Sequence, residues 1–457
     1  MLNGEPMPNK ILLVYILTLF TLPSLTVKLA AQSPQPYPHA VTDRLIHQET
    51  PMSPPPRNVV FTDPDFGSSM VRATDPTTNF KLPGTFLRTG GSGEENEWSL
   101  DSRKFYVDGQ GGQVLAFAFD PKTMTVGSLP GAAPGKALLL PLREGATFSL
   151  IDSDLIYGTS EPNTLTIMSY RFSTGISTPV IDTRTCGLQP QLGIGPSVVS
   201  DDDLRTSLDD QRFSISEGGQ QSGQHMFVVV YDRKLGCRWY NTQTAQIGGQ
   251  WGPKGFATAT SPYLIRHAYL SRNGRYVVIF VNYFGWYVWD LYSLNVTACP
   301  VHSKTDECAG YKTVGYKTLI NGPAITGDMQ IAQRPLASIG DITQLALPVA
   351  FEWGQVQHFS WNNVNIHDNT PVCGSTYDYE GDPSIDEPFA GEIFCAETDG
   401  LGNTIWRFAH NRALWVEPFF QTQPLGSVSR NGRFYLFTST WDGLLGKEAN
   451  GTPLSHS

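Results

Sequence analysis

The 457-residue sequence lacks the short motifs that mark the common enzyme classes. It contains no GxSxG elbow, no P-loop, no HExxH helix and no GxGxxG placed between a strand and a helix. Cysteine pairs of the CxxC type are also absent, which argues against zinc-thiolate and redox centres. The chain therefore carries no recognised catalytic or nucleotide-binding signature, and no motif that requires a cofactor.

Charge is scarce as well. Charged residues make up only 16% of the chain, and 42 acidic residues against 32 basic ones give a net charge of −10. Such a surface repels phosphate backbones, so nucleic acid is not expected as a partner. After residue 25 no apolar run is long enough to cross a bilayer, so we expect no membrane insertion after the N-terminal segment is removed.

The N-terminal segment has the layout of a secretory signal peptide. Lys10 precedes the apolar run 11–25, and the small residues Ala30 and Ala31 follow it. An uncleaved membrane anchor is the alternative, but the run is short for a span and Pro23 interrupts it. The sequence predicts a signal peptide over residues 1–31 and a secreted or periplasmic protein.

Six cysteines in an exported chain favour disulfides over metal thiolates. Six cysteines permit 15 pairings, so the sequence alone does not fix the connectivity. Their spacing suggests three bridges, Cys186–Cys237, Cys299–Cys308 and Cys373–Cys395.

The chain is rich in turn-forming residues and in weak internal repeats. With 44 glycines, 33 prolines and 11% aromatic residues, its composition suits an all-β protein. The segment 427–439 combines a polar Ser-Arg-Asn-Gly turn with a short aromatic strand, and a close copy starts at Ser271. Together with weaker copies, the repeats are anchored on Ser or Thr at positions 99, 149, 207, 271, 326, 360 and 429.

A second recurring element lies between the anchors: an apolar strand, a polar turn and another strand. Two hairpins per repeat give four antiparallel strands, which form one blade of a propeller. A single blade exposes a hydrophobic face that only stacking against neighbours can bury. The sequence predicts one β-propeller of about seven four-stranded blades, with two β-sandwich domains as the alternative.

The predicted boundaries follow from composition. The proline-rich residues 32–57 read as a linker, residues 58–446 as the propeller and residues 447–457 as a flexible tail. The first strand, residues 58–62, is expected to pair with the last strands after Ser429, because this pairing closes the ring and removes a free sheet edge.

Two of the turns carry a resemblance to a known family. Residues 271–275 and 429–433, both Ser-Arg-Asn-Gly-Arg, resemble the Ser-Pro-Asp-Gly-Lys/Arg core of TolB-like (WD40-like) propeller repeats. Arg stands in place of Pro and Asn in place of Asp. The resemblance implies a propeller and no particular activity.

Two histidines lie close to anchors. His267 precedes Ser271 by four residues and His358 precedes Ser360 by two, so both are expected near the entry of a blade. Imidazole is suited to metal binding and to proton transfer near neutral pH. The segment 355–358, Gln-Val-Gln-His, resembles the His/Gln metal cluster of propeller-type oligogalacturonate lyases, which has more histidines. Hydrogen bonding within blade loops is the alternative role.

The long segment 361–410 supplies further candidates. His367, His410 and Arg407 are candidate catalytic residues, although Arg407 and His410 also alternate like residues of an ordinary strand, which would point them to different faces. The clustered carboxylates of Asp378, Glu380 and Asp382 are suited to a divalent cation such as Ca²⁺, but they lack EF-hand spacing, and such charge runs are commonly just solvated.

Aromatic rings offer a possible sugar-binding surface. Trp286, Trp361 and Tyr377 are the candidate ligand-binding residues, because exposed rings stack on sugars. Filling of the space between blades is the alternative. The leading hypothesis is a secreted, monomeric propeller that binds a protein, glycan or small molecule on one face. The alternative is a carbohydrate-active lyase or hydrolase that uses channel-side histidines, with or without a divalent metal.

Overall fold

A computed structural model describes most of the chain. The described residues are 36–90, 96–143, 145–159, 165–188, 204–218, 225–259, 262–281, 285–299, 311–322, 331–341, 343–344, 355–378, 388–399, 404–414, 419–449, 451 and 453–457. The chain divides into two compact units, Met1–His39 and Ala40–Ser457, and all secondary structure considered below belongs to the second. The predicted signal peptide lies outside the described residues.

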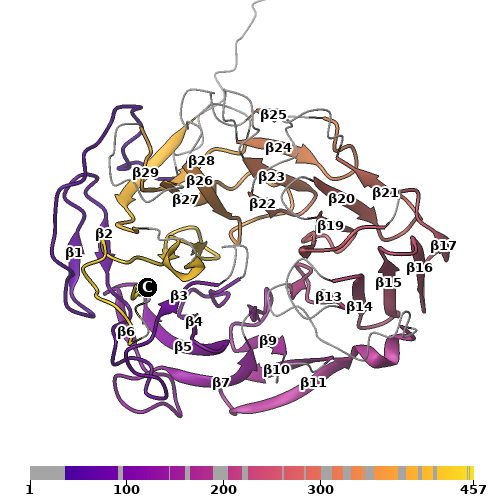
Figure 1. The fold of residues 1–457 in the computed structure, drawn as a ribbon, viewed down its shortest axis with the longest axis horizontal. Coiled ribbons are helices and arrows are strands. Elements are labelled where there is room, and N and C mark those ends of the chain that lie inside the picture. The colour runs from indigo at the N-terminus through magenta and orange to yellow at the C-terminus, as the bar shows by residue number, and fades with distance from the viewer. Residues whose placement is uncertain are drawn as a thin grey trace, which may run out of the picture. The chain divides into compact units, whose positions relative to one another are not determined.

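The second unit is an all-β propeller with six blades, whose sheets follow one another around a common axis (Figure 1). Blade 1 comprises β3 Leu87–Arg88, β4 Lys104–Gly109, β5 Gln113–Asp120, β6 Thr125–Gly127 and β7 Leu138–Arg143. Blade 2 comprises β8 Thr147–Phe148, β9 Leu155–Thr159, β10 Thr166–Arg171 and β11 Ile176–Asp182, and the 3₁₀ helix η1 Thr183–Cys186 follows it.

The next two blades differ in strand number. Blade 3 comprises β12 Arg205–Thr206, β13 Arg212–Glu217, β14 Phe227–Asp232, β15 Gly236–Asn241, β16 Gln246–Gly249 and β17 Gly255–Phe256. Blade 4 comprises β18 His267–Leu270, β19 Tyr276–Val281, β20 Gly285–Asp290 and β21 Val296–Ala298.

The last two blades have four strands each. Blade 5 comprises β22 Tyr311–Val314, β23 Thr318–Gly322, β24 Ala332–Pro335 and β25 Thr343–Gln344. Blade 6 comprises β26 Gln355–Ser360, β27 Val372–Asp378, β28 Glu392–Ala396 and β29 Ile405–His410. Two-stranded sheets outside the blades are formed by β1 Val60–Thr62 with β2 Ser69–Val71, and by β30 Gly426–Val428 with β31 Tyr435–Phe437.

The predicted number of about seven blades is therefore corrected to six. The anchor at Ser429 opens only the two-stranded β30–β31 sheet, because among the described residues no further strand pairs with β31. The anchor assigned to Thr326 lies outside the described residues, and the first turn of blade 5 instead begins at Gly315, directly after β22.

The predicted pairing of residues 58–62 with the last strands is not found among the described strands. β1 pairs with β2, and Val59 and Val60 are exposed. The C-terminal residues occupy the neighbouring positions instead, since the Ser457 carbonyl accepts hydrogen bonds from the backbone N–H of Ala73 and Thr74 at 3.1 and 2.8 Å. Residues 453–457, within the segment predicted as a flexible tail, are all buried.

Hydrophobic layers fill the spaces between consecutive blades, as the stacking argument predicts. The layer between blades 3 and 4 joins Val228 and Tyr240 to Ile279 and Trp289. Equivalent layers lie between blades 1 and 2, 2 and 3, 4 and 5, and 5 and 6, and a further cluster joins blade 1 to Leu436 of β31. Blades 2–5 thus bury both faces against neighbouring blades, and blade 1 buries one face against blade 2 and packs the other against Leu436.

The repeated Ser-x-Asn/Asp anchor has a structural role. In the turns at Ser99, Ser207, Ser271 and Ser429, the serine Oγ donates to the Asp or Asn two residues later, at 2.6–2.9 Å. The same Oγ accepts the backbone N–H five residues later, at 2.9–3.0 Å. Each anchor side chain is therefore satisfied within its own turn, as in other side-chain-to-backbone motifs, while backbone N–H groups of the turns at Ser207 and Ser271 also donate to neighbouring blades.

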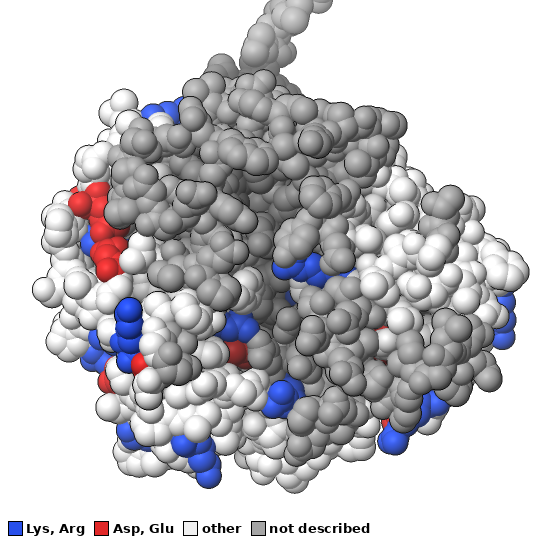
Figure 2. Space-filling view, viewed as in Figure 1, with Lys and Arg blue, Asp and Glu red and all other residues white. Residues whose placement is uncertain are grey.

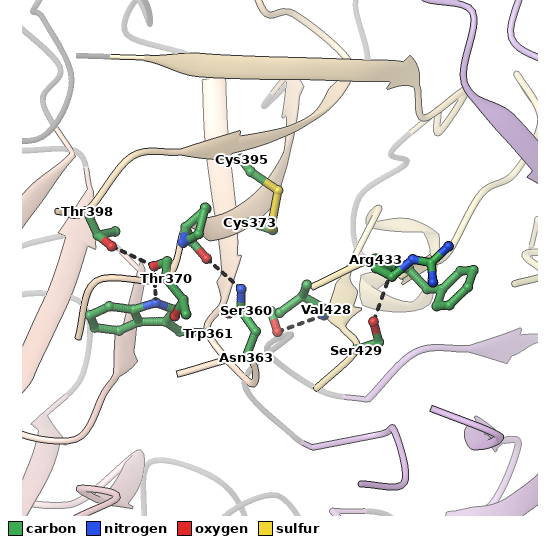
Figure 3. The surroundings of a disulfide bond; sticks show 12 residues. Ser360, Trp361, Asn363, Thr370, Cys373, Cys395, Thr398, Val428, Ser429 and Arg433 are labelled. Atoms are coloured by element: carbon green, nitrogen blue, oxygen red, sulfur yellow. Dashed lines mark hydrogen bonds between the residues drawn. A yellow bond between two sulfur atoms is a disulfide. The ribbon is translucent and has the colours of Figure 1, made fainter. Parts of the chain in front are cut away.

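Two of the three predicted disulfides are present. Cys186 is bonded to Cys237 with 5.2 Å between the Cα atoms, and Cys373 to Cys395 with 3.9 Å. The second bridge joins β27 to β28 beside Trp361 (Figure 3). Cys308 lies outside the described residues. Disulfides suggest an oxidising environment outside the cytoplasm, and no helix of the described residues is long and apolar enough to span a membrane.

Candidate functional site

The innermost strands carry a ring of buried side chains at one repeated position. The first strands that Figure 1 labels, such as β3 and β22, lie toward the common axis, and the residue two positions before each turn is buried from blade to blade; in blade 1 this residue, Glu97, lies between β3 and β4. These residues, none more than 4% exposed, are Glu97, Thr147, Arg205, Tyr269, Thr313, His358 and Ser427. We refer to them as the axial ring; six of its seven members are polar or charged rather than aromatic.

Two further cations stand on innermost strands. Arg88 of β3 and Lys312 of β22 are only 7% and 4% exposed. Figure 2 shows Lys and Arg side chains, with acidic atoms beside one of them, around the central hollow of the face that it presents. The basic residues of an acidic protein are thus partly gathered at its axis, where low-dielectric surroundings strengthen their field.

His358 lies in the first of two groups of polar and aromatic side chains at the axis. Its Nε2 is 3.2 Å from the Tyr377 hydroxyl and 3.2 Å from Oε1 of Gln423, and its ring stacks on Tyr377. The contact with Gln423 places a proton on Nε2, because an amide oxygen only accepts. Arg88 adjoins this group, with its guanidinium 5.4 Å from the ring centroid of Phe420 in the 3₁₀ helix η3 Phe420–Thr422.

Glu97 and Tyr435 extend this first group toward blade 1. The Glu97 carboxylate accepts a hydrogen bond from the backbone N–H of Gly90. Burial raises the pKa of Tyr435 above its ordinary value and the nearby Glu97 carboxylate adds to the rise, while a hydrogen bond with Ser375 opposes it. Tyr435 is therefore a neutral hydroxyl at physiological pH.

His267 belongs to the second group, on the other side of blade 5. Its ring stacks on Tyr269 with the centroids 5.7 Å apart, and Phe280 packs against both. Arg205 of blade 3 lies over Tyr269 at 4.5 Å, and Lys312 of blade 5 lies over Phe280 at 4.6 Å. Cation–π contacts of this kind hold both charges in place.

The structure therefore does not place His267 and His358 in one contact group. They lie on β18 of blade 4 and β26 of blade 6, with β22 of blade 5 between these strands in the order of the blades. Among the described residues, no group of three or more His, Cys, Asp or Glu is arranged to hold a metal ion. Of the predicted cation ligands, Glu380 and Asp382 lie outside the described residues, and only the backbone of Asp378 is described.

The axis is closed by hydrogen bonds at the end where the anchor turns lie. Arg272 donates to the Thr206 carbonyl of blade 3 at 3.1 Å and to Oδ1 of Asn362, which follows β26 of blade 6, at 3.1 Å. Asn362 in turn donates to Ser427 Oγ at 3.0 Å. These side chains are all buried, so one strand end of the axial ring is occupied by the protein itself.

The predicted aromatic residues are buried rather than displayed. Trp286 is 1% exposed in the layer between blades 4 and 5, and Trp361 is 1% exposed in the layer between blades 5 and 6. The Trp361 indole N–H donates to the Thr370 carbonyl at 2.8 Å (Figure 3). Both tryptophans fill space between blades, whereas Tyr377 belongs to the group around His358.

Arg407 and His410 lie on one side of β29 although they are three residues apart. Strand alternation predicts opposite faces, but the β28–β29 register shifts between Ile393 and Phe394, and this irregularity re-aims the side chains. Arg407 lies over the Phe66 ring at 5.3 Å, and the His410 ring packs against Phe66 at 5.1 Å.

Both residues hold the N-terminal segment in place. Arg407 pairs with buried Glu392 at 2.7 Å and with Asp43 at 2.9 Å. Burial lowers the pKa of His410 to about 4, and Arg412 and Arg407 lower it further against the opposing effect of Asp65. Buried Arg407 and Arg412 also bond to Asp43, Glu49 and Thr50, which ties the segment predicted as a linker to the end of blade 6.

His367 is exposed, and its neighbour Asp368 has the defined structural role. Asp368 accepts hydrogen bonds from Tyr316 N, Lys317 N and Thr318 Oγ1 at 2.6, 2.8 and 2.9 Å. Sequence reasoning missed this contact, and it also missed Arg88, Arg205 and Lys312. The sequence signal that could have revealed Arg205 is its position two residues before an anchor, where Glu97 and His358 also lie.

No protein-family model matches the chain, and no curated protein is similar to it in sequence. Among solved structures, an oligogalacturonate lyase from Vibrio parahaemolyticus is 12% identical with a TM-score of 0.50, covering 87% of this chain and 95% of that one. An oligogalacturonate lyase in complex with manganese is 13% identical with a TM-score of 0.51, covering 90% and 96%.

The Neurospora crassa Pan2 WD40 domain also matches, at 11% identity and a TM-score of 0.42 over 78% of this chain and 86% of that chain. Identities this low carry no activity from one protein to the other. The TolB-like type stays a prediction, since none of these comparisons tests it. The likeness to the two lyase structures supports the fold alone, and the chain is a β-propeller.

Proposed function

We propose that the chain is a secreted β-propeller that binds an acidic oligosaccharide at its axis. The supporting observation is that Arg88, Arg205 and Lys312 stand on the innermost strands of three different blades in a chain of net charge −10. Guanidinium and ammonium groups recognise carboxylates through charge-assisted hydrogen bonds. The polar members of the axial ring supply the neutral partners that sugar hydroxyls need.

The fold adds support of a weaker kind. Proteins named oligogalacturonate lyases share this architecture over most of their length. Oligogalacturonate is a chain of carboxylated sugars, which makes it the appropriate first probe. The cations here are braced by Phe420, Tyr269 and Phe280, so their positions depend little on the ligand.

The test is calorimetric titration of tetragalacturonate into the mature chain at 20 mM and 500 mM NaCl. We expect binding that weakens with salt, and that weakens about tenfold or more in Arg205→Gln and in Lys312→Gln, equivalent to about 1.4 kcal/mol. Arg205→Lys, which keeps the charge, should retain most of the affinity. Lys234→Gln, at an exposed turn of blade 3, is the matched control and should bind normally.

Two results would overturn the proposal. One is wild-type binding that does not respond to salt; the other is equal affinity in wild type, Arg205→Gln and Lys312→Gln. Circular dichroism of each variant checks that the blades remain folded, and the Arg205→Lys variant separates loss of charge from loss of packing.

A lyase is the second candidate, because His358 and Tyr377 form an imidazole–phenol pair at 3.2 Å beside the axis. Such a pair is able to accept and return a proton during elimination from a uronic acid. Incubation with polygalacturonate, with added Mn²⁺ or with EDTA, should then raise the absorbance of unsaturated products, and His358→Gln should abolish the increase. Absence of any increase on uronic-acid polysaccharides rejects the lyase and leaves binding.

A further inference from the structure

A pocket of about 430 Å³ lies away from the axis, where blade 2 meets the outer strands of blade 3. Residues 185–187, in and just after η1, form one wall, and β15, β16 and β17 form the rest. This volume falls within the range of small-ligand sites and suits one or two sugar units. None of its lining residues belongs to the axial ring.

The pocket is built from rigid parts. The Cys186–Cys237 disulfide ties η1 to β15 beside it. Trp239 and Gly248 are direct cross-strand partners, and a side chain at position 248 would collide with the indole ring. Gly249 has φ of +117°, which favours glycine, and a Cβ there would meet the Cys237 carbonyl. The glycines therefore let the Trp239 ring and the Cys237 carbonyl pack directly against β16 in the pocket wall.

Polar side chains surround this space. Oε1 of Gln250 accepts the Cys237 backbone N–H at 2.6 Å, which fixes the amide and leaves its NH₂ group as a donor. Thr185 donates to the Asp182 carbonyl at 2.7 Å, so its oxygen still accepts. Gln246 and the exposed Lys254 complete the polar lining.

From this geometry we infer that the pocket is a second binding site, for a neutral saccharide. The described lining residues include no carboxylate, which disfavours cations, and only one cationic group, at the exposed rim. Neutral amide and hydroxyl groups pair with sugar hydroxyls, which both donate and accept, while Trp239, only 9% exposed, forms part of the wall. The site is independent of the proposed function at the axis.

The experiment is saturation-transfer NMR of the mature chain with maltose, cellobiose and lactose, tested separately up to 20 mM, with affinities taken from titration. We expect at least one disaccharide to bind in the millimolar range. Gln246→Ala should weaken it about five- to tenfold, as for the loss of a hydrogen bond. Thr185→Phe, at an exposed position, should block the pocket without disturbing a buried contact.

Matched variants distinguish this site from the axis. Gln211→Ala, on the anchor turn of the same blade, and Arg205→Gln should leave disaccharide binding unchanged. Failure of all three disaccharides to bind overturns the inference, as does binding that survives both Gln246→Ala and Thr185→Phe. Loss of tetragalacturonate binding with retained disaccharide binding would reject only the proposed function at the axis.

Discussion

The first turns of blades 4 and 5 close equivalent hairpins with different chemistry. In blade 4, Ser271 bonds to Asn273 at 2.7 Å and to the Tyr276 N–H at 2.9 Å, so the anchor side chain finds its partners within the turn, although the N–H groups of Arg272 and Asn273 donate to carbonyls of the blade 5 turn. In blade 5 the turn starts at Gly315, and Asp368 from beyond blade 6's first strand accepts the N–H groups of Tyr316 and Lys317.

The difference shows that one structural requirement can be met locally or at a distance. In blade 4 the anchor serine closes the turn by bonding to residues of the same turn. In blade 5 Gly315 stands in place of the serine. The N–H group of Tyr316 in this turn donates to a carboxylate 52 residues further along the chain. The blade 5 turn therefore adds a bond between blades that the blade 4 turn does not make through its anchor serine.

The largest effect is expected from Asp368→Ala. Removal of the carboxylate leaves the buried Thr318 hydroxyl and the part-buried N–H groups of Tyr316 and Lys317 without this acceptor, which should lower the free energy of unfolding by about 3 kcal/mol. Ser271→Ala should cost about 1–2 kcal/mol, since it removes one acceptor from a local turn. Urea unfolding monitored by tryptophan fluorescence measures both.

His367→Ala is the matched control for this comparison. His367 is exposed and adjacent to Asp368, so its removal should change stability by less than about 0.5 kcal/mol. If Asp368→Ala is no more destabilising than Ser271→Ala, the prediction that the distant carboxylate stabilises its turn more than the local serine does is wrong.

Gly315→Ala should have the next largest effect. A Cβ at this position would lie 2.5 Å from Asp368 Oδ1 and 2.5 Å from the Trp361 ring, which its own hydrogen bond to Thr370 holds in place. Overpacking of this kind costs about 2 kcal/mol. Gly274→Ala in blade 4 should cost about 1 kcal/mol, from its φ of +69° and from Cβ contacts of 3.2 Å with Arg212 Cδ and Ser207 Cβ. Equal losses in the two variants would contradict the account.

This contrast also explains what the sequence could and could not reveal about the fold. The Ser-x-Asn/Asp turns are recognisable in the sequence because the hydrogen-bond partners of each anchor serine side chain lie within six consecutive residues. These turns predicted a propeller. The blade 5 turn contains no such residue, so the anchor was assigned to Thr326 and the spacing became irregular. A partner 52 residues away leaves no local pattern.

The candidate site shows the same limit. His358 was predicted because histidine is rare and stands near an anchor, and the structure places it on an innermost strand. Arg205 and Lys312 were missed because a single charged residue in a strand resembles a solvated one. Alignment of the turns reveals the buried position two residues before each anchor, which holds Arg205 in blade 3 but Thr313, not Lys312, in blade 5.

The smallest predicted effect comes from comparing the pKa of Asp368 with that of a second buried carboxylate, Glu217. Burial raises the pKa of Asp368, but three hydrogen-bond donors oppose the rise, whereas at Glu217 burial dominates and brings the pKa to about 7. A carboxyl with a raised pKa binds more protons in the folded state, so stability falls as pH rises from the unfolded value of 4.5 through 7.

For wild type we therefore expect the free energy of unfolding to fall by about 1 kcal/mol between roughly pH 5.5 and 6.5 through Glu217. Glu217→Gln keeps the shape and removes the titration, so the slope over this window should flatten by that amount. Urea midpoints at several pH values measure the slope. An unchanged slope in Glu217→Gln would mean that this carboxyl is already ionised in the folded state, and that its donors are as effective as those around Asp368.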